Sequence, residues 1–227
     1  MTNTGFENEL DGADEQVRRE HIRCTLKHGN EPRMGDYFDS LARTWEENLE
    51  PCGAKHRATA FLAGVKPGSR VLDVGCGTGI MAQAYLDAGA AEVVALDVAP
   101  GMIEIAREKF AREPRVRFEC ASIYDFEDDR PFDAFVAYNV YPHLMDKHGL
   151  ARKAASLLGE QGRFIVAHGL GREAINAHHD CVPAHICTHL ETARASAQAW
   201  EELFDIDQIV DTDRYYCFGG TLKSAAL

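Results

Sequence analysis

The stretch VLDVGCGTGI, residues 71–80, decides the fold of this chain. A short apolar run leads into three glycines at alternate positions, Gly75, Gly77 and Gly79, and a helical pattern begins at Ile80. Glycines let the backbone turn tightly and approach a ligand, and the first N–H groups of the following helix point at that ligand. The stretch therefore predicts a buried strand, a ligand-binding loop and a helix in immediate succession.

Two details separate this loop from the usual dinucleotide-binding loop. The third glycine falls one place earlier than in the G-x-G-x-x-G pattern, and Asp73 stands two residues before the first glycine. Asp97 ends the next apolar run, where its carboxylate can accept both hydrogen bonds of a ribose diol. The loop and Asp97 together predict a site for a ribose-containing ligand.

Strands and helices are expected to alternate outward from the loop. Apolar runs predict strands over 70–75, 91–97, 116–121, 132–139 and 162–168, and helical patterns predict helices over 80–89, 101–111 and 146–158. This alternation is typical of an α/β fold, a mostly parallel sheet with helices on both faces. The segments 206–212 and 215–223 follow a helix expected near 193–203 and have no crossover helix between them, which predicts an antiparallel pair at one edge.

The N-terminal part differs from the rest in composition. Residues 1–34 carry many charges and few large apolar side chains, which predicts a polar N-terminal arm, either loosely ordered or a surface helix. The remaining residues, 35–227, are expected to form one domain. It begins with helical spacing of large apolar side chains over 37–49, followed by a second helix over 54–63.

The charge of the chain argues against one class of partner. Its 24 Lys and Arg against 36 Asp and Glu give a formal net charge of −12, whereas a nucleic-acid backbone needs a basic face. No apolar run approaches the roughly 20 residues that cross a bilayer, and the N-terminus is polar where a secretory signal would be apolar. The seven cysteines are an odd number without regular spacing, as expected of reduced thiols. We therefore expect a cytoplasmic protein without a nucleic-acid or membrane partner.

The glycine stretch also resembles a known family. VLDVGCGTG, followed by LDVAPGMIEIAREK over 96–109, is similar to the first two motifs of class I S-adenosylmethionine-dependent methyltransferases, and the small-molecule, type 11-like branch is the nearest match. The resemblance extends over about 37–227. It implies a Rossmann-like sheet of seven strands with the last one antiparallel, S-adenosylmethionine as the cofactor, and transfer of a methyl group to a small-molecule acceptor.

The resemblance implies a set of cofactor-binding residues. The three glycines face the amino-acid portion of the cofactor near Asp73, Asp97 holds the ribose hydroxyls, and Met102 packs on the adenine. Ser122 stands beside the adenine where family members usually carry an Asp, and Asn139 flanks the sulfonium. The full predicted set is Asp73, Gly75, Cys76, Gly77, Thr78, Gly79, Asp97, Val98, Met102, Ser122, Ile123 and Asn139.

Candidates for the acceptor side follow strand ends or precede the first strand. His143 comes after the fourth strand and His168 ends the fifth, so each is a candidate general base or hydrogen-bond partner. Tyr37 completes the catalytic candidates as an aromatic residue of a closing helix. Phe38 and Tyr141 are expected to contact the acceptor.

The segment AHGLGREAINAHHD, residues 167–180, predicts an acceptor clamp. If it is helical, Arg172, Asn176 and His179 share one face. A guanidinium there suits an acceptor with a carboxylate or another anionic oxygen, because it can bind such a group with two hydrogen bonds.

Several alternatives remain open for this chain. The segment 178–189 supplies candidate metal ligands, but Pro183 interrupts a helix and no recognised zinc spacing appears, so no metal is assigned. The same side chains suit a thiol, metalloid or metal-assisted acceptor. A methyltransferase acting on nucleic acid is opposed by the acidic charge and by the YNVYP ending of the fourth strand. A non-catalytic regulator that binds the cofactor is the alternative from a different class. The candidate metal ligands are His178, Cys181, His185, Cys187 and His189.

Overall fold

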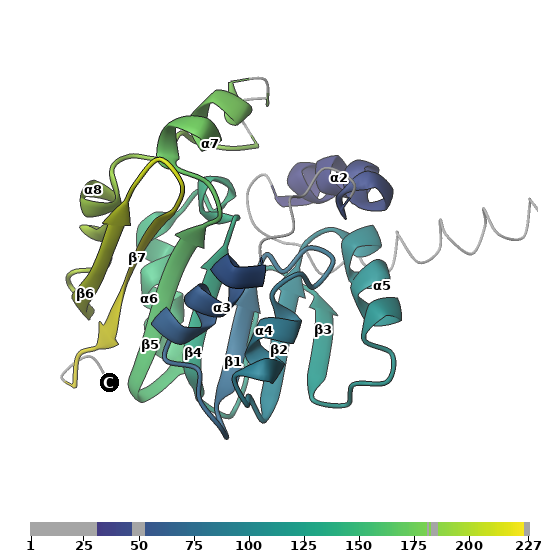
Figure 1. The fold of residues 1–227 in the computed structure, drawn as a ribbon, viewed down its shortest axis with the longest axis horizontal. Coiled ribbons are helices and arrows are strands. Elements are labelled where there is room, and N and C mark those ends of the chain that lie inside the picture. Colours follow the sequence, from purple (N-terminus) through teal and green to yellow (C-terminus); the bar gives the residue numbers. More distant parts are fainter. Residues whose placement is uncertain (1–30, 47–52, 181, 183–185, 225–227) are drawn as a thin grey trace, which may run out of the picture.

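One mixed sheet organises the molecule (Figure 1). The computed structural model describes residues 31–46, 53–180, 182 and 186–224. Within these residues seven strands lie in the order β3-β2-β1-β4-β5-β7-β6. Their bounds are Arg70–Val74 (β1), Glu92–Asp97 (β2), Val116–Cys120 (β3), Phe132–Tyr138 (β4), Leu158–His168 (β5), Phe204–Asp211 (β6) and Tyr216–Leu222 (β7).

The pairing confirms the predicted fold class. Strands β1 to β5 are parallel, and β7 lies antiparallel between β5 and β6. The chain runs from β1 outward to β2 and β3, and then returns to place β4 on the other side of β1. Ligands of open α/β sheets bind at such a reversal, outside the carboxyl ends of the strands.

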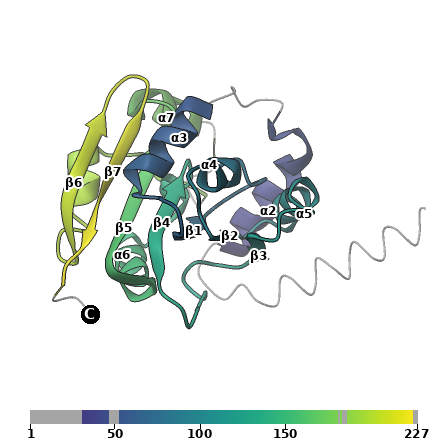
Figure 2. The same cartoon turned by 60° about the horizontal axis from the view of Figure 1, so that its bottom comes forward.

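Helices cover both faces of the sheet (Figure 2). Side chains of a strand alternate between faces, so Val71 and Val93 pack on one side while Leu72 and Val94 pack on the other. The first side is covered by α3 (Gly53–Leu62), α4 (Ala82–Asp87) and α5 (Pro100–Lys109). The second side is covered by α6 (Lys147–Leu157) and α8 (Ala193–Ala197).

Three short helical segments lie beyond the carboxyl ends of the strands. They are α2 (Glu31–Leu41) with the following 3₁₀ turn η1 (Ala42–Thr44), the 3₁₀ turn η3 (Tyr141–His143) after β4, and α7 (Arg172–His179) after β5. In Figure 1, α2 and α7 lie at the top of the view, above the sheet. Helices α2 and α7 therefore cover this end of the molecule, and they belong to neither of the two helix layers that cover the faces of the sheet.

Several element bounds differ from the sequence-based expectation. The helix predicted over 37–49 begins earlier, at Glu31, and its α-helical part ends at Leu41. Met34 is 7% exposed, so the polar arm gives way to buried structure before residue 35; the arm itself, 1–30, lies outside the described residues. Strand β5 begins at Leu158, which pairs with Phe132, and α8 ends at Ala197. No helix of the described residues is long and apolar enough to cross a membrane.

Candidate active site

Two adjoining cavities open at the carboxyl edge of the sheet. The loop cavity is lined by the glycine loop and by the ends of β1, β2 and β4. The histidine cavity lies beside it, between α2, α3 and α7. Their volumes are about 80 Å³ and 700 Å³. Both are lined by the same six residues, so the two spaces adjoin along this shared wall: Phe38, Trp45, Ile80, Tyr138, Asn139 and His143.

The backbone of the glycine loop requires glycine. Gly75, Gly77 and Gly79 have φ of 68°, 53° and 78°, in the left-handed region that side chains disfavour. A Cβ at Gly75 would lie 2.3 Å from Cγ2 of Val140. Gly75 and Gly77 line the loop cavity together with Cys76. A ligand in the loop cavity can therefore approach the backbone closely at Gly75, Cys76 and Gly77.

Asp97 lies at the end of β2 and lines the loop cavity. Its Oδ2 accepts the N–H of Gly77 at 2.8 Å, and its Oδ1 accepts the N–H of Ala99 at 2.9 Å. Burial raises the pKa of this carboxyl, and the backbone N–H donors oppose that shift. Each oxygen retains a lone pair, so the carboxylate can hold two hydroxyl groups of a ligand while it fixes the loop.

An apolar wall follows Asp97 in the loop cavity. Val98, Met102, Ile123 and Leu144 line it, and Met102 is 1% exposed. Aliphatic and sulfur-containing side chains provide a flat surface suited to an aromatic ring. Ala121 completes this wall next to Ile123.

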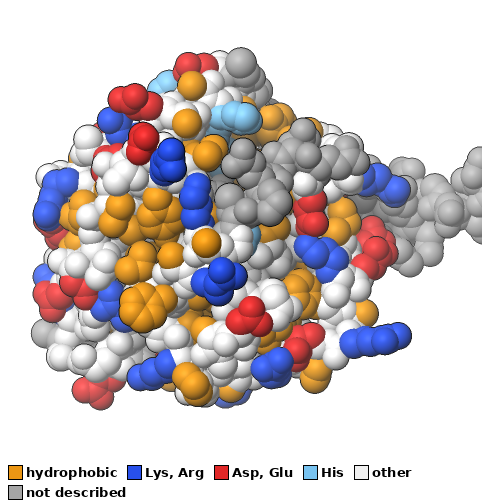
Figure 3. Space-filling view, in the orientation of Figure 1, with side chains coloured by type: hydrophobic (Ala, Val, Ile, Leu, Met, Phe, Trp, Pro, Cys, Tyr) orange, Lys and Arg blue, Asp and Glu red, His pale blue; other side chains and the backbone are white. Residues whose placement is uncertain are grey.

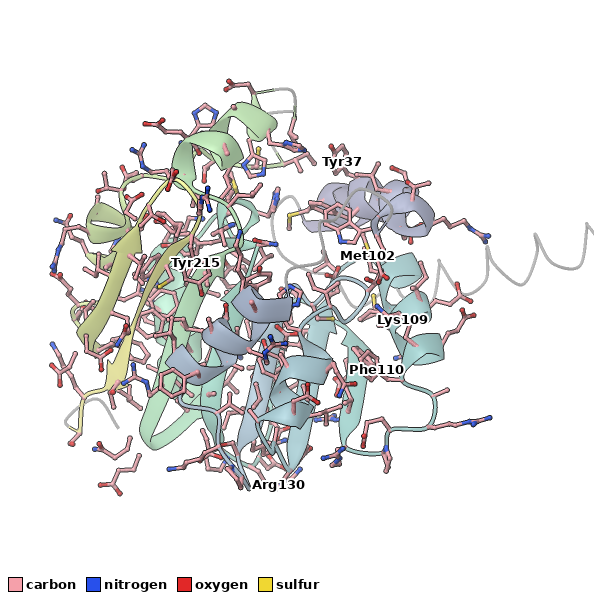
Figure 4. The ribbon with its side chains drawn as sticks, viewed as in Figure 1. Tyr37, Met102, Lys109, Phe110, Arg130 and Tyr215 are labelled. Carbon is pink, nitrogen blue, oxygen red and sulfur yellow. The ribbon has the colours of Figure 1, made fainter. Side chains whose placement is uncertain are left out.

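A cap formed by α2 and η1 closes the loop cavity from above. Met34, Phe38 and Trp45 project into its lining, and Figure 4 shows Met102 on α5 beneath α2. Asp39 accepts the N–H of Gly101 at 2.6 Å, which fastens α2 to the start of α5. Glu46 accepts the hydroxyl of Thr78 and the ammonium of Lys109, the latter at 2.5 Å.

Four predicted cofactor-binding residues do not line either cavity. Asp73 is 1% exposed inside the sheet; one oxygen accepts the hydroxyl of Tyr85 at 3.1 Å, and burial raises the pKa of the carboxyl to about 7. The hydroxyl of Thr78 binds Glu46, and that of Ser122 accepts the N–H of Tyr124 at 3.1 Å. These residues, with Gly79, support the loop and the turn after β3 from behind.

Three of the predicted acceptor-side histidines converge on the histidine cavity. His143 on η3, His168 at the end of β5 and His179 on α7 all line it. The rings of His143 and His179 meet edge to face at 5.1 Å, and Phe38 packs edge-on against His143 at 4.9 Å. Histidine side chains are visible at the top of Figure 3, where α7 lies in Figure 1.

Other predicted acceptor residues lie elsewhere. Arg172 faces Asp211, with Nε 3.6 Å from its carboxylate, and Asn176 uses its amide to bind the backbone of Leu190 at 2.7 and 3.0 Å. Tyr141 is 2% exposed in the core, where its hydroxyl meets Nε1 of Trp200 at 3.4 Å. None of the three lines either cavity, so the predicted clamp face of α7 contributes only His179. Tyr37 and Phe38 do line the histidine cavity.

The structure adds site residues that the sequence patterns did not single out. Trp45 and Tyr138 stand on the shared wall, and His56 packs edge to face on Tyr138 at 5.2 Å. Among the described residues, no three His, Cys, Asp or Glu side chains converge as metal ligands. Cys181 and His185 of the candidate metal set lie outside the described residues, and His189 pairs with Asp180 at 3.0 Å.

Comparison with known proteins finds similarity to methyltransferases over part of the chain. A model of the methyltransferase domain family matches residues 71–162. The ubiquinone biosynthesis O-methyltransferase of Xanthomonas campestris pv. campestris (strain B100) is 33% identical over 141 residues, 58% of this chain and 59% of that protein. The malonyl-(acyl-carrier protein) O-methyltransferase of Acetivibrio thermocellus is 37% identical over 93 residues, 40% of this chain and 32% of that protein. The chain thus spans little more than half the length of the first of these relatives.

A solved structure supports the fold. The N-methyltransferase NodS from Bradyrhizobium japonicum WM9, in complex with S-adenosylhomocysteine, superposes with a TM-score of 0.66 at 14% identity, over 86% of this chain and 100% of that chain. The residues that line the loop cavity also match the chemistry of S-adenosylmethionine, because Asp97 suits a ribose diol, Gly75 and Gly77 leave the backbone open to a ligand, and the wall around Met102 suits an adenine. The chain therefore has the fold of this methyltransferase, and its residues 71–162 match the methyltransferase domain family.

Proposed function

We propose that this protein transfers a methyl group from S-adenosylmethionine, held in the loop cavity, to a small-molecule acceptor held in the histidine cavity. The observation that carries the proposal is the shared wall, which brings a donor space and an acceptor space together at His143, Tyr138 and Asn139. The volume of about 700 Å³ lies within the range of about 300–1,000 Å³ that is typical of small-molecule sites. Both named relatives are O-methyltransferases, which favours oxygen as the attacking atom.

His143 is the proposed general base. Its Nδ1 lies 3.0 Å from the carbonyl oxygen of Ile186, and because a carbonyl only accepts, Nδ1 carries the proton. The lone pair is therefore on Nε2, on a ring that lines both cavities. Burial lowers the pKa of His143 to about 4, so the ring is neutral at pH 7 and its Nε2 can accept a hydrogen bond from an acceptor hydroxyl, the geometry that general-base catalysis requires.

The other residues of the shared wall position the reactants. Bound S-adenosylmethionine supplies an electrophilic methyl group, so the contribution of the protein is orientation and exclusion of water. Phe38 and Trp45 pack edge to face at 5.8 Å over this wall. Asn139 adopts φ of 57° and accepts the N–H of Gly169 at 2.9 Å, which fixes the end of β4 against the end of β5.

The test combines binding with turnover. Calorimetry with S-adenosylhomocysteine measures the donor site, and methyl transfer from labelled S-adenosylmethionine to a panel of small acceptors measures activity. We expect His143→Gln to lower kcat by about 100-fold or more while cofactor affinity changes little. His148→Gln is the matched control, because His148 is exposed on α6 and lines neither cavity. Absence of cofactor binding by folded protein would refute the proposal, and binding without any turnover would favour a regulator.

A further inference from the structure

The inner wall of the histidine cavity is made of imidazoles. His143, His168 and His179 reach it from η3, β5 and α7, elements that are far apart in the sequence. His143 is 7% exposed and His168 is 2% exposed. Figure 3 shows histidine side chains on the surface at the end of the molecule where α7 lies in Figure 1. Three separate elements thus deliver the same side chain to one wall.

Two ring nitrogens on this wall lack a hydrogen-bond partner among the described residues. They are Nε2 of His168 and Nδ1 of His179, and both are buried. A buried polar atom without a partner costs about 1–3 kcal/mol, so such atoms are usually satisfied by protein, water or a ligand. Both rings line the cavity, so a bound molecule can supply the missing partner once a ring turns its nitrogen toward it.

The charged groups that act on His168 are bases. His143, His179 and Lys147 all disfavour its protonation, and together with burial they lower its pKa to about 3. Burial likewise lowers the pKa of Lys147 to about 7; its ammonium donates to the carbonyl of Tyr141. Glu46 is the one carboxylate in the described lining of the cavity, and Lys109 already pairs with it. The described lining therefore holds no free counter-charge for an imidazolium.

Other groups around His168 do not change this balance. Tyr216 on β7 packs edge to face on its ring at 5.7 Å and donates its hydroxyl to Ser196. Arg172 on α7 faces Asp211, outside the cavity lining. The remaining titratable groups that line the cavity are Tyr37 on α2, His56 on α3, Tyr138 on β4 and His178 on α7.

We propose that the methyl acceptor carries an oxyanion, a carboxylate or a phosphate, which binds between His168 and His179. The proposal rests on the proposed methyltransferase function and names the class of its acceptor. The oxyanion supplies the missing counter-charge, and His168 takes up one proton from solvent as the acceptor binds. The imidazolium then donates a hydrogen bond to the oxyanion, which remains ionised. The anionic acceptor that the sequence linked to Arg172 is thus assigned to histidines instead.

Matched pairs of acids and amides test the charge of the acceptor. With protein saturated by S-adenosylhomocysteine, we would measure binding of benzoate against benzamide, hexanoate against hexanamide, and phenyl phosphate against phenol. We expect at least one anion to bind 10-fold or more tighter than its neutral counterpart. Its affinity should rise up to 10-fold per unit as the pH falls from 8 to 6, with proton uptake visible in buffers of different ionisation enthalpy.

Substitution locates the binding group. His168→Gln should reduce the preference for the anion to threefold or less and leave the affinity for S-adenosylhomocysteine unchanged, whereas His148→Gln should retain the preference. If His168→Gln does not fold, His179→Gln on the half-buried face of α7 decides the matter. The proposal is overturned if no anion of the panel outbinds its neutral partner, if the preference survives these substitutions, or if it requires added Zn²⁺. Failure of S-adenosylhomocysteine to bind would instead refute the proposed function.

Discussion

The loop cavity and the histidine cavity share a wall but are built by different means. The loop cavity depends on backbone: three left-handed glycines, and one carboxylate, Asp97, whose two oxygens already accept N–H groups of the chain. The histidine cavity depends on side chains, and two of its buried ring nitrogens have no partner among the described residues. The loop cavity is shaped by the backbone before a ligand binds. The histidine cavity instead holds buried hydrogen-bonding atoms that a ligand could pair with.

This contrast is tested most severely at Gly75. Gly75→Ala introduces a methyl group 2.3 Å from Val140 at φ of 68°, so it combines backbone strain with a steric overlap. We expect the free energy of unfolding to fall by about 3 kcal/mol and binding of S-adenosylhomocysteine to be lost. Denaturant unfolding and calorimetry measure the two effects.

Gly68→Ala is the control for this change. Gly68 also has a positive φ, 92°, but a Cβ there meets no atom within 4 Å. Only backbone strain remains, so we expect a loss of about 1 kcal/mol and unchanged cofactor binding. Equal effects of the two substitutions would mean that close approach at Gly75 is not what builds the loop cavity.

Asp97 is expected to show the next largest effect. Asp97→Ala removes a charged acceptor from a ribose diol and also releases the N–H groups of Gly77 and Ala99, so affinity for S-adenosylhomocysteine should fall about 100-fold. Asp97→Asn keeps one acceptor oxygen and should cost about 10-fold. Asp207→Ala, which removes the exposed partner of Arg163, is the control and should leave the affinity unchanged. A small loss in Asp97→Ala would show that the backbone alone holds the cofactor.

The histidine cavity predicts a pH dependence of stability. Burial lowers the pKa of His168 to about 3 in the folded chain, whereas a histidine of the unfolded chain has a pKa of about 6.5, so the unfolded chain binds more protons below about pH 6.5. The stabilisation is present above pH 6.5 and is lost as the pH falls toward 3, by up to about 1.4 kcal/mol per unit. Asp73, whose pKa is raised to about 7, acts in the opposite direction, so the comparison must be made against a variant.

His168→Gln isolates this contribution. Between pH 6.5 and pH 5 the wild-type protein should lose up to about 1.4 kcal/mol per unit more than the variant, measured by urea unfolding. His148→Gln should follow the wild-type slope, because His148 is exposed. Parallel slopes for wild type and His168→Gln would mean that His168 is not held neutral by its surroundings.

The two cavities also differ in how far the sequence predicts them. Gly75, Gly77 and Asp97 were predictable because a tight loop and a strand end impose residue types at fixed spacing within about 25 residues. Asp73 and Thr78 lie in the same stretch, and Ser122 follows the next strand. None of the three lines either cavity, because spacing along the sequence does not reveal which way a side chain points.

The histidine cavity depends on tertiary contacts that spacing does not encode. His143 and His168 were predicted because strand ends meet at one edge, and both line the cavity. The helical spacing on α7 predicted that Arg172 and Asn176 contact the acceptor, but neither residue lines a cavity. Arg172 faces Asp211 instead, and Asn176 binds the backbone of Leu190. Trp45, by contrast, lines the site directly after the 3₁₀ turn η1, where helical periodicity predicted a continuing helix.

The smallest expected effect concerns the cap that the two cavities share. Glu46→Gln keeps the shape of the side chain but weakens its contacts with Lys109 and Thr78, which join η1 to the glycine loop. Lys109 and Glu46 side chains are 35% and 47% exposed, so water and salt screen the pair and it contributes little. We expect affinity for S-adenosylhomocysteine to fall about threefold or less, and the difference to vanish at about 1 M salt.

Glu113→Gln is the matched control for the cap, because it breaks a comparable ion pair, with Arg115, away from both cavities. A loss above 10-fold for Glu46→Gln that persists in high salt would contradict this account. It would mean that the polar contacts of Glu46 hold the cap closed, rather than burial of Met34, Phe38 and Trp45. The loop cavity would then depend on a side-chain latch as much as on its backbone, and the contrast with the histidine cavity would narrow.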